Sequence, residues 1–280
     1  EHRLGQFLRP RVRDDYVVST KVGRVYSRPA DVSRFTDWEY GRRWQGGLEF
    51  IFKFDYTAAG VRRSYEDSLQ RLGLNRIDCL VIHDLDHTHQ KSEDGVRRAL
   101  EQLDTGGGYQ ELATLRSRGE ISAIGAGINP TGMIPRLLER FDIDYFLVAM
   151  PYTLLDQSAL DSEFPLCEKH GAQVVIGAVF ASGILAGGRA QYGYRPASPE
   201  ILEKVKTLRK LCERHAISLR AAALQFTLAH PLVAAAIPGA ESPQQVAGIN
   251  AAYQETVPRE FWEELRKARL VHPAAPLPGD

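Results

Sequence analysis

Two side chains that could take part in proton transfer, Lys21 and His83, stand at the ends of short apolar runs. Lys21 ends Y-V-V-S-T-K, and His83 ends I-D-C-L-V-I-H. In parallel α/β folds the carboxyl ends of the strands form the active-site face. An ammonium group lowers the pKa of a neighbouring proton donor, and an imidazole can orient a carbonyl or donate a hydrogen bond to it. A lysine or histidine at a strand end often satisfies only a loop, so the spacing alone leaves catalysis and a structural role equally open.

Two segments rich in small residues could bind a phosphate-bearing ligand. Residues 177–188 (G-A-V-F-A-S-G-I-L-A-G-G) follow a strand-like run, and their small side chains would let a ligand approach the backbone. Residues 237–240 (I-P-G-A) precede Ser242 and Pro243, which mark a helix start whose N–H groups could bind a phosphate. A tight structural turn explains either segment equally well.

The elements that must position these residues alternate between short apolar strands and amphipathic helices. Strands are expected at 16–21, 77–83, 121–127, 145–149, 173–177 and 233–238. Helices are expected at 1–9, 60–72, 94–118 with a break near 106–108, 133–140, 159–170, 199–215, 219–229 and from 243 onward. Residues 273–280 are expected to form a frayed tail. The alternation indicates βαβ units and a parallel sheet.

Six expected strands leave two folds open. An open, doubly wound α/β sheet is one, and a (β/α)8 barrel, which needs eight strands, is the other. Glu1 is not a start methionine, and residues 1–9 already have a helical pattern. For the barrel we therefore expect the first two strands and the first helix to be missing from this sequence. Residues 1–280 are expected to form a single domain.

The composition argues against several classes of partner. Lys plus Arg and Asp plus Glu both number 35, so no net charge favours nucleic acid or an anionic membrane. No apolar run approaches the roughly 20 residues of a membrane span, and no signal peptide is evident. The three cysteines lack metal-ligand spacing and are expected to be reduced core thiols of a cytoplasmic protein. His87 and His89 fit the polar rim of a loop better than a metal site, so no metal is expected.

Ordered stretches along the whole chain carry a family resemblance. They are EHRLG from Glu1, STKVGR from Ser19, FDYTAAGVRRSYEDSLQRLGLNRID from Phe54, VIHDLD from Val81, YTLLDQ from Tyr152, ASGILAGG from Ala181, AAALQFTLAHP from Ala221 and IPGAESPQQV from Ile237. Together they resemble the aldo-keto reductase family, and within it the branch of aldose, galactose, fucose and pyridoxal dehydrogenases. The resemblance favours the (β/α)8 barrel.

The resemblance implies a reaction and roles for two residues. In that family hydride passes between a nicotinamide and a carbonyl or alcohol carbon. A tyrosine hydroxyl gives or takes the proton beside a lysine, an aspartate and a histidine. Lys21 matches the lysine and His83 the histidine, whereas the tyrosine and the aspartate are expected upstream of Glu1. Tyr56 and Tyr152 match ordinary residues of the branch and are not given the acid's role.

The resemblance also implies an NAD or NADP cofactor. Many reductases of the family have a lysine and an arginine that reach the adenosine 2′-phosphate, and Gly239 and Gln245 stand in their places here. The loss of two cations favours NAD. The other implied cofactor contacts are Asn129, Ser182, Gly183, Leu185, Ala240 and Asn250.

The expected function is therefore NAD(P)-dependent oxidation or reduction of a sugar or small alcohol or carbonyl substrate, with aldose 1-dehydrogenase as its most specific form. A non-catalytic sensor or partner subunit that binds nicotinamide on the same fold is the alternative. A third interpretation makes Lys21 the Schiff-base lysine of an aldolase-like barrel. The long segment after Lys21 contains Trp38 and Trp44, which either stack on a sugar or pack the loop down. The sequence indicates no oligomeric state.

Overall fold

The computed structural model describes residues 1–31, 48–193 and 195–280, and the chain divides into two compact units, residues 1–127 and 128–280. Trp38 and Trp44 lie outside the described residues. The single domain predicted over residues 1–280 stays a prediction. In the described part of the chain no helix is long and apolar enough to cross a membrane.

The first unit is built on three parallel strands, with β4 (Cys79–Ile82) between β1 (Ser19–Val22) and β5 (Ala123–Ile128). Lys21 lies in register with Val81. The backbone N–H of His83 continues the ladder by donating to the carbonyl of Val22 over 3.0 Å. The ends of β1 and β4 that carry Lys21 and His83 therefore lie side by side.

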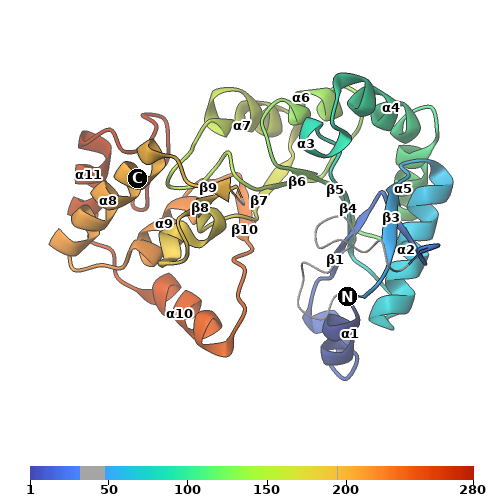
Figure 1. The fold of residues 1–280 in the computed structure, drawn as a ribbon, viewed down its shortest axis with the longest axis horizontal. Helices are drawn as coiled ribbons and strands as arrows, with labels where there is room; N and C mark the ends of the chain where they lie inside the picture. The colour runs from blue at the N-terminus through green and yellow to red at the C-terminus, as the bar shows by residue number, and fades with distance from the viewer. Residues whose placement is uncertain (32–47, 194) are drawn as a thin grey trace. The chain divides into compact units, whose positions relative to one another are not determined.

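The first unit also contains several helices and one antiparallel hairpin (Figure 1). The helices are α1 (His2–Leu8), α2 (Ala58–Leu72), α3 (His87–Gln90), α4 (Glu93–Leu103) and α5 (Gly108–Ser117), with a 3₁₀ turn, η1 (Arg13–Asp15). The hairpin pairs β2 (Arg24–Ser27) with β3 (Ile51–Phe54). Helix α2 begins where the Thr57 side chain accepts from the N–H of Gly60, and it packs its buried face on β1 and α5.

The second unit has the same plan, with β7 (Gln173–Ile176) between β6 (Tyr145–Val148) and β10 (Val233–Ala236), all parallel. Its helices are α6 (Met133–Leu138), α7 (Ala159–His170), α8 (Pro199–Arg214), α9 (Leu219–Leu228), α10 (Pro243–Gln254) and α11 (Arg259–Lys267). The 3₁₀ segment η3 (Ala181–Ala186) follows β7, and β8 (Gln191–Tyr192) pairs with β9 (Arg195–Pro196). Helix α9 packs against η3, β10 and α10 (Figure 1).

All six predicted strands and all the predicted helices are present, and the break predicted near residue 106 separates α4 from α5. The frayed tail predicted for residues 273–280 was wrong. Ala275 and Leu277 are only 2% and 3% exposed, and Asp280 forms an ion pair with Arg266. Arg266 of α11, a helix that the sequence analysis did not predict, also donates to the carbonyl of Ala275 and so holds this segment against the helix.

A glycine at the end of β1 fixes how closely Tyr56 approaches the strand. Gly23 has a φ of +99°, and a Cβ atom there would lie 2.4 Å from Cε1 of Tyr56. Gly23→Ala combines backbone strain with a ring clash, so we expect the free energy of unfolding to fall by about 2–4 kcal/mol. Urea denaturation measures this. In the matched control Gly119→Ala, φ is +70° but no atom lies within 4 Å, so only the backbone strain of about 1 kcal/mol applies. Equal losses in the two variants would contradict the packing role of Gly23.

Candidate active site

The structure brings Lys21 and His83 together at adjoining strand ends of the first unit, as the sequence predicts. The two side chains interact electrostatically, because the charge of Lys21 is one of the causes that lower the pKa of His83. The His83 side chain is 26% exposed, so a ligand can reach its ring. A cation and an imidazole are thus placed at one solvent-accessible edge.

His83 is a neutral imidazole across the physiological pH range. Burial is the main cause that lowers its pKa, to about 2, and the positive charges of Arg24 and Lys21 act in the same direction. A neutral imidazole has one N–H donor and one acceptor nitrogen. His83 can therefore orient an oxygen by a hydrogen bond, but it cannot supply a proton from an imidazolium.

The backbone of His83 is held by Tyr56. The Tyr56 hydroxyl donates to the His83 carbonyl over 2.7 Å and accepts a hydrogen bond from Nε2 of Gln90 over 3.0 Å. Gln90 Nε2 also donates to the carbonyl of Asp84 over 2.9 Å. Burial raises the pKa of Tyr56, and its hydroxyl proton is already engaged. These contacts agree with leaving Tyr56 out of proton transfer.

A buried carboxylate, Asp84, is the counter-ion of Arg24 and lies close enough to Lys21 to raise the pKa of that lysine. Asp84 is 5% exposed and has a φ of +55°, a left-handed conformation that aspartate and asparagine adopt more readily than most residues. Its Oδ2 forms an ion pair with Arg24 and lies 3.2 Å from Nε2 of His83, and its Oδ1 lies 3.5 Å from Nε2 of His89. A lone pair on Nε2 of His83 would face the carboxylate and be repelled. The contact therefore favours the tautomer of His83 in which Nε2 carries the proton.

Arg24, the partner of Asp84, comes from the β2–β3 hairpin. Its guanidinium carbon lies 4.3 Å from the centroid of the Phe52 ring and 5.6 Å from that of Phe54. Cation–π contact with these rings restrains the long side chain, so the ion pair with Asp84 costs less conformational entropy when it forms. The hairpin thus supplies the charge that allows Asp84 to be buried.

The ionisation of Lys21 depends on the same carboxylate. Desolvation by the surrounding protein atoms is the main cause that lowers its pKa, although the residue stays accessible to solvent; Asp84 and Glu1 raise the pKa, and Arg24 lowers it. The carboxylate of Glu1 is held near β1 by Thr20, Arg71 and the hydroxyl of Ser68. Desolvation thus favours the neutral amine of Lys21, and the carboxylates of Asp84 and Glu1 favour its charged ammonium form.

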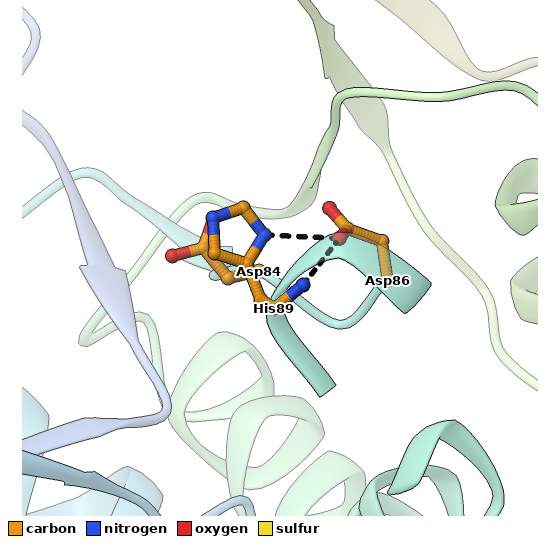
Figure 2. A group of neighbouring side chains, drawn as sticks. All are labelled: Asp84, Asp86 and His89. Atoms are coloured by element: carbon orange, nitrogen blue, oxygen red, sulfur yellow. Dashed lines mark hydrogen bonds and ion pairs between the residues drawn. The ribbon is translucent and has the colours of Figure 1, made fainter. Parts of the chain in front are cut away.

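Asp84, Asp86 and His89 form a compact group in which possible ligand atoms lie within 4.8 Å of one another (Figure 2). Asp86, which is fully buried, accepts from the backbone N–H of His89 over 3.1 Å and lies 2.9 Å from its Nδ1. The hydrogen bond to Asp86 is the main cause that raises the pKa of His89. Arg24 already supplies a positive charge to Asp84, and both carboxylates favour the protonated form of His89, so the arrangement is a network of ion pairs and hydrogen bonds. The absence of a metal at this site stays a prediction.

The predicted cofactor residues all lie in the second unit. In η3 three consecutive residues, Ala181, Ser182 and Gly183, have positive φ values of 45°, 60° and 91°, which makes a compact turn after β7. The N–H of Gly188 closes the turn by donating to the carbonyl of Gly183 over 2.8 Å. A Cβ on Gly188 would lie only 2.9 Å from that carbonyl oxygen, so the close approach requires glycine. Leu185 is buried and its N–H bonds to the Phe180 carbonyl over 3.3 Å. The segment brings backbone close to the carboxyl end of β7, as a cofactor loop requires.

The other predicted cofactor residues lie after β5 and β10. Asn129 follows β5, while Gly239 and Ala240 lie between β10 and the Ser242 cap of α10, and Asn250 is exposed on that helix. The side-chain oxygen of Gln245 accepts from the backbone N–H of Glu241 over 2.7 Å. The backbone N–H of Gln245 donates to Ser242 Oγ over 3.2 Å. Gln245 therefore helps to cap α10 in addition to any contact with a ligand.

Comparison with known proteins identifies the class to which this fold and this edge belong. The aldo/keto reductase family profile matches residues 1–269. Pyridoxal 4-dehydrogenase of Microbacterium luteolum is 38% identical over 97% of this chain and 80% of its own length. D-threo-aldose 1-dehydrogenase of a Pseudomonas species is 34% identical over 97% of this chain and 80% of its own length. Among solved structures, an aldo-keto reductase from Bacillus halodurans in its holo form superposes with a TM-score of 0.68 at 24% identity, over 98% of this chain and 78% of that one.

The chain belongs to the aldo/keto reductase family. The glycerol dehydrogenase of Gluconobacter oxydans also superposes with a TM-score of 0.68, over 97% of this chain and 78% of that one, at 21% identity. These likenesses confirm the α/β fold of the barrel type and exclude the doubly wound alternative. The protein is an oxidoreductase that uses a nicotinamide cofactor.

Sequence reasoning missed two arginines near these segments, Arg24 and Arg220. Arg24 and Asp84 are separated by 60 residues and meet only because β2 follows β1 closely and Asp84 follows β4. Arg220, on α9, reaches η3 by donating to the carbonyl of Ala186 over 3.1 Å. The motif VIHDLD contained Asp84, but nothing in its spacing pointed to its partner.

Removing the charge of Asp84 tests the electrostatic account of this edge. Asp84→Asn keeps the side-chain shape, and asparagine suits the left-handed backbone. Because the charge of Asp84 raises the pKa of Lys21, we expect the variant to lower that pKa further below the ordinary lysine value. An NMR titration of ¹³C-methylated lysines measures the shift.

Asp78→Asn is the matched control. Asp78 is 9% exposed, lies just before β4 and pairs with Arg13 over 2.6 Å, but it is not among the charges that act on Lys21. An unchanged Lys21 pKa in Asp84→Asn, or an equal fall in Asp78→Asn, would contradict the account.

Proposed function

We propose that the protein is an NAD-preferring dehydrogenase that oxidises the cyclic hemiacetal form of a sugar, or of a similar hydroxy-aldehyde, to a lactone. The observation that carries the proposal is the pairing of Lys21 with a neutral His83 at adjoining strand ends in a chain of this family. The names of the two relatives, an aldose 1-dehydrogenase and a pyridoxal 4-dehydrogenase, support the substrate class.

The two named substrates share one chemical feature. An aldose closes a ring when one of its hydroxyls adds to C1, and pyridoxal carries a hydroxymethyl group next to its aldehyde, so it can close a ring in the same way. Each closed form has a hemiacetal carbon that bears one C–H and one O–H. Loss of hydride from that carbon and of the proton from that hydroxyl gives a lactone and a reduced nicotinamide, so atoms and charge balance.

The residues of the second unit fit a dinucleotide. The left-handed turn at Ala181–Gly183 and the α10 start at Ser242 both follow carboxyl ends of parallel strands, where such cofactors bind. When bound, the cofactor supplies the hydride acceptor. We assign Ser182, Gly183, Leu185, Gly239, Ala240, Gln245, Asn129 and Asn250 to its surroundings.

Within the first unit, His83 and Lys21 have separate roles. Because the Nε2–H of His83 faces Asp84, its unprotonated nitrogen, Nδ1, accepts a hydrogen bond from the substrate hydroxyl and orients that oxygen. In the family pattern a tyrosine hydroxyl exchanges the proton with the substrate. The Lys21 ammonium would stabilise the anionic form of that tyrosine, which takes up the proton of the substrate. No tyrosine described here is assigned this task, because the Tyr56 hydroxyl bonds to His83 and Tyr152 is fully buried among Phe164 and Phe226.

The preference for NAD rests on α10. Gly239 and Gln245 stand where a lysine and an arginine would contact a 2′-phosphate, and the Gln245 side chain is engaged in capping. Glu241, next to them, adds a negative charge that disfavours a 2′-phosphate. These features support NAD over NADP.

The proposal is tested by following nicotinamide reduction with a panel of aldoses and pyridoxal. We expect turnover with NAD for substrates that form a free hemiacetal, and none for methyl glycosides, whose anomeric hydroxyl is blocked. Lys21→Met and His83→Gln should each lower kcat/KM by about 10²–10⁴-fold, the usual contribution of a positioned acid–base group.

The exposed residues Lys53 and His87 provide matched controls. Lys53→Met and His87→Gln should keep the wild-type rate. Cofactor binding with no turnover of any substrate would move the assignment to a sensor or partner subunit, and equal losses in target and control variants would remove Lys21 and His83 from the site.

A further inference from the structure

Arg220 of α9 reaches into the space between η3 and α10. Its Nη2 donates to the carbonyl of Ala186, at the end of η3, over 3.1 Å. Its Nη1 lies against Gly248 of α10, so closely that a Cβ on that glycine would be 2.4 Å away. One guanidinium therefore contacts both segments to which the sequence assigns cofactor contacts.

In the described part of the chain this guanidinium has no acidic partner. Among the residues that the structure describes, no carboxylate lies within ion-pair distance of Arg220, although most other partly buried arginines are paired. The carboxylate of Glu255, at the end of α10, instead accepts hydrogen bonds from the backbone N–H and from the hydroxyl of Ser218. Arg220 is half-buried, and a partly desolvated cation without a counter-ion is costly. The arrangement is one that a bound anion would stabilise.

The position of Arg220 indicates which anion. Strands β7 and β10 are parallel neighbours, with Ile176 in register with Ala236, so η3 and the start of α10 follow the same edge. This is the edge where α/β folds bind the phosphates of dinucleotides. A planar guanidinium suits phosphate oxygens because it can donate two parallel hydrogen bonds.

We propose that Arg220 binds a phosphate of the nicotinamide dinucleotide. Gly248 leaves the room that the guanidinium occupies. The inference rests on the proposed function only in taking a nicotinamide dinucleotide as the ligand, and it adds a residue from α9 to a site otherwise formed by loops and α10. The ligand group is either the pyrophosphate, common to NAD and NADP, or the 2′-phosphate of NADP.

The test is fluorescence titration of the protein with NADH and with NADPH. Arg220→Gln removes the charge, and Arg220→Lys keeps the charge without the planar fork. We expect the Kd of Arg220→Gln to rise about 10-fold or more, as for the loss of a charge-assisted hydrogen bond, with Arg220→Lys between it and wild type. An equal rise for both cofactors assigns Arg220 to the pyrophosphate, and a rise for NADPH alone assigns it to the 2′-phosphate.

Controls separate binding from folding. Arg209, exposed on α8, gives the matched variant Arg209→Gln, which should bind like wild type. Circular dichroism and Tm establish that Arg220→Gln is folded. Gly248→Ala should displace the guanidinium and weaken binding in wild type, but add nothing when combined with Arg220→Gln.

Two results would overturn the inference. If wild type binds a cofactor and Arg220→Gln binds it within twofold as tightly, Arg220 does not contact phosphate, and the proposed function stands. If intact wild type binds neither cofactor, the proposed function fails together with this inference.

Discussion

The burial of one carboxylate organises the chemistry of the first unit. Asp84 can lie at the end of β4 with 5% exposure because Arg24, fixed against Phe52, pairs with it. In return its charge raises the pKa of Lys21, and its contact with Nε2 of His83 favours one tautomer. Removing one member of such a buried pair leaves the other charge uncompensated, at a cost of about 3–5 kcal/mol. Stability and the ionisation of the two candidate catalytic residues thus depend on the same ion pair.

Local patterns were sufficient to predict the strands and helices and to single out the first two candidate site residues, whereas the choice of the barrel needed the family resemblance. The apolar runs before Lys21 and His83 are strands, and because parallel strands end at one edge their side chains had to meet. Helices α7 and α8 were predicted almost to the residue, because Gly171 ends the first and Ser198 with Pro199 begins the second. These signals lie within a few residues of the features they specify.

Contacts between distant residues could not be predicted from the sequence. The Arg24–Asp84 pair joins a hairpin to a strand end 60 residues away, and Arg220 meets Gly248 only through the packing of α9 on α10. The frayed tail was predicted from its place at the end of the sequence, whereas Leu277 is buried and Asp280 forms an ion pair with Arg266. In each case burial and partner choice depend on tertiary packing, which composition and periodicity do not encode.

In the proposed reaction, Lys21 and His83 serve direct hydride transfer from a hemiacetal carbon. The most direct measurement uses the best substrate of the panel with deuterium at that carbon, and analyses the reduced cofactor by mass spectrometry. We expect the deuterium to be found in the nicotinamide, the labelled substrate to react more slowly, and His83→Gln to suppress the transfer. Deuterium released to water, or a reduced cofactor without label, would contradict it.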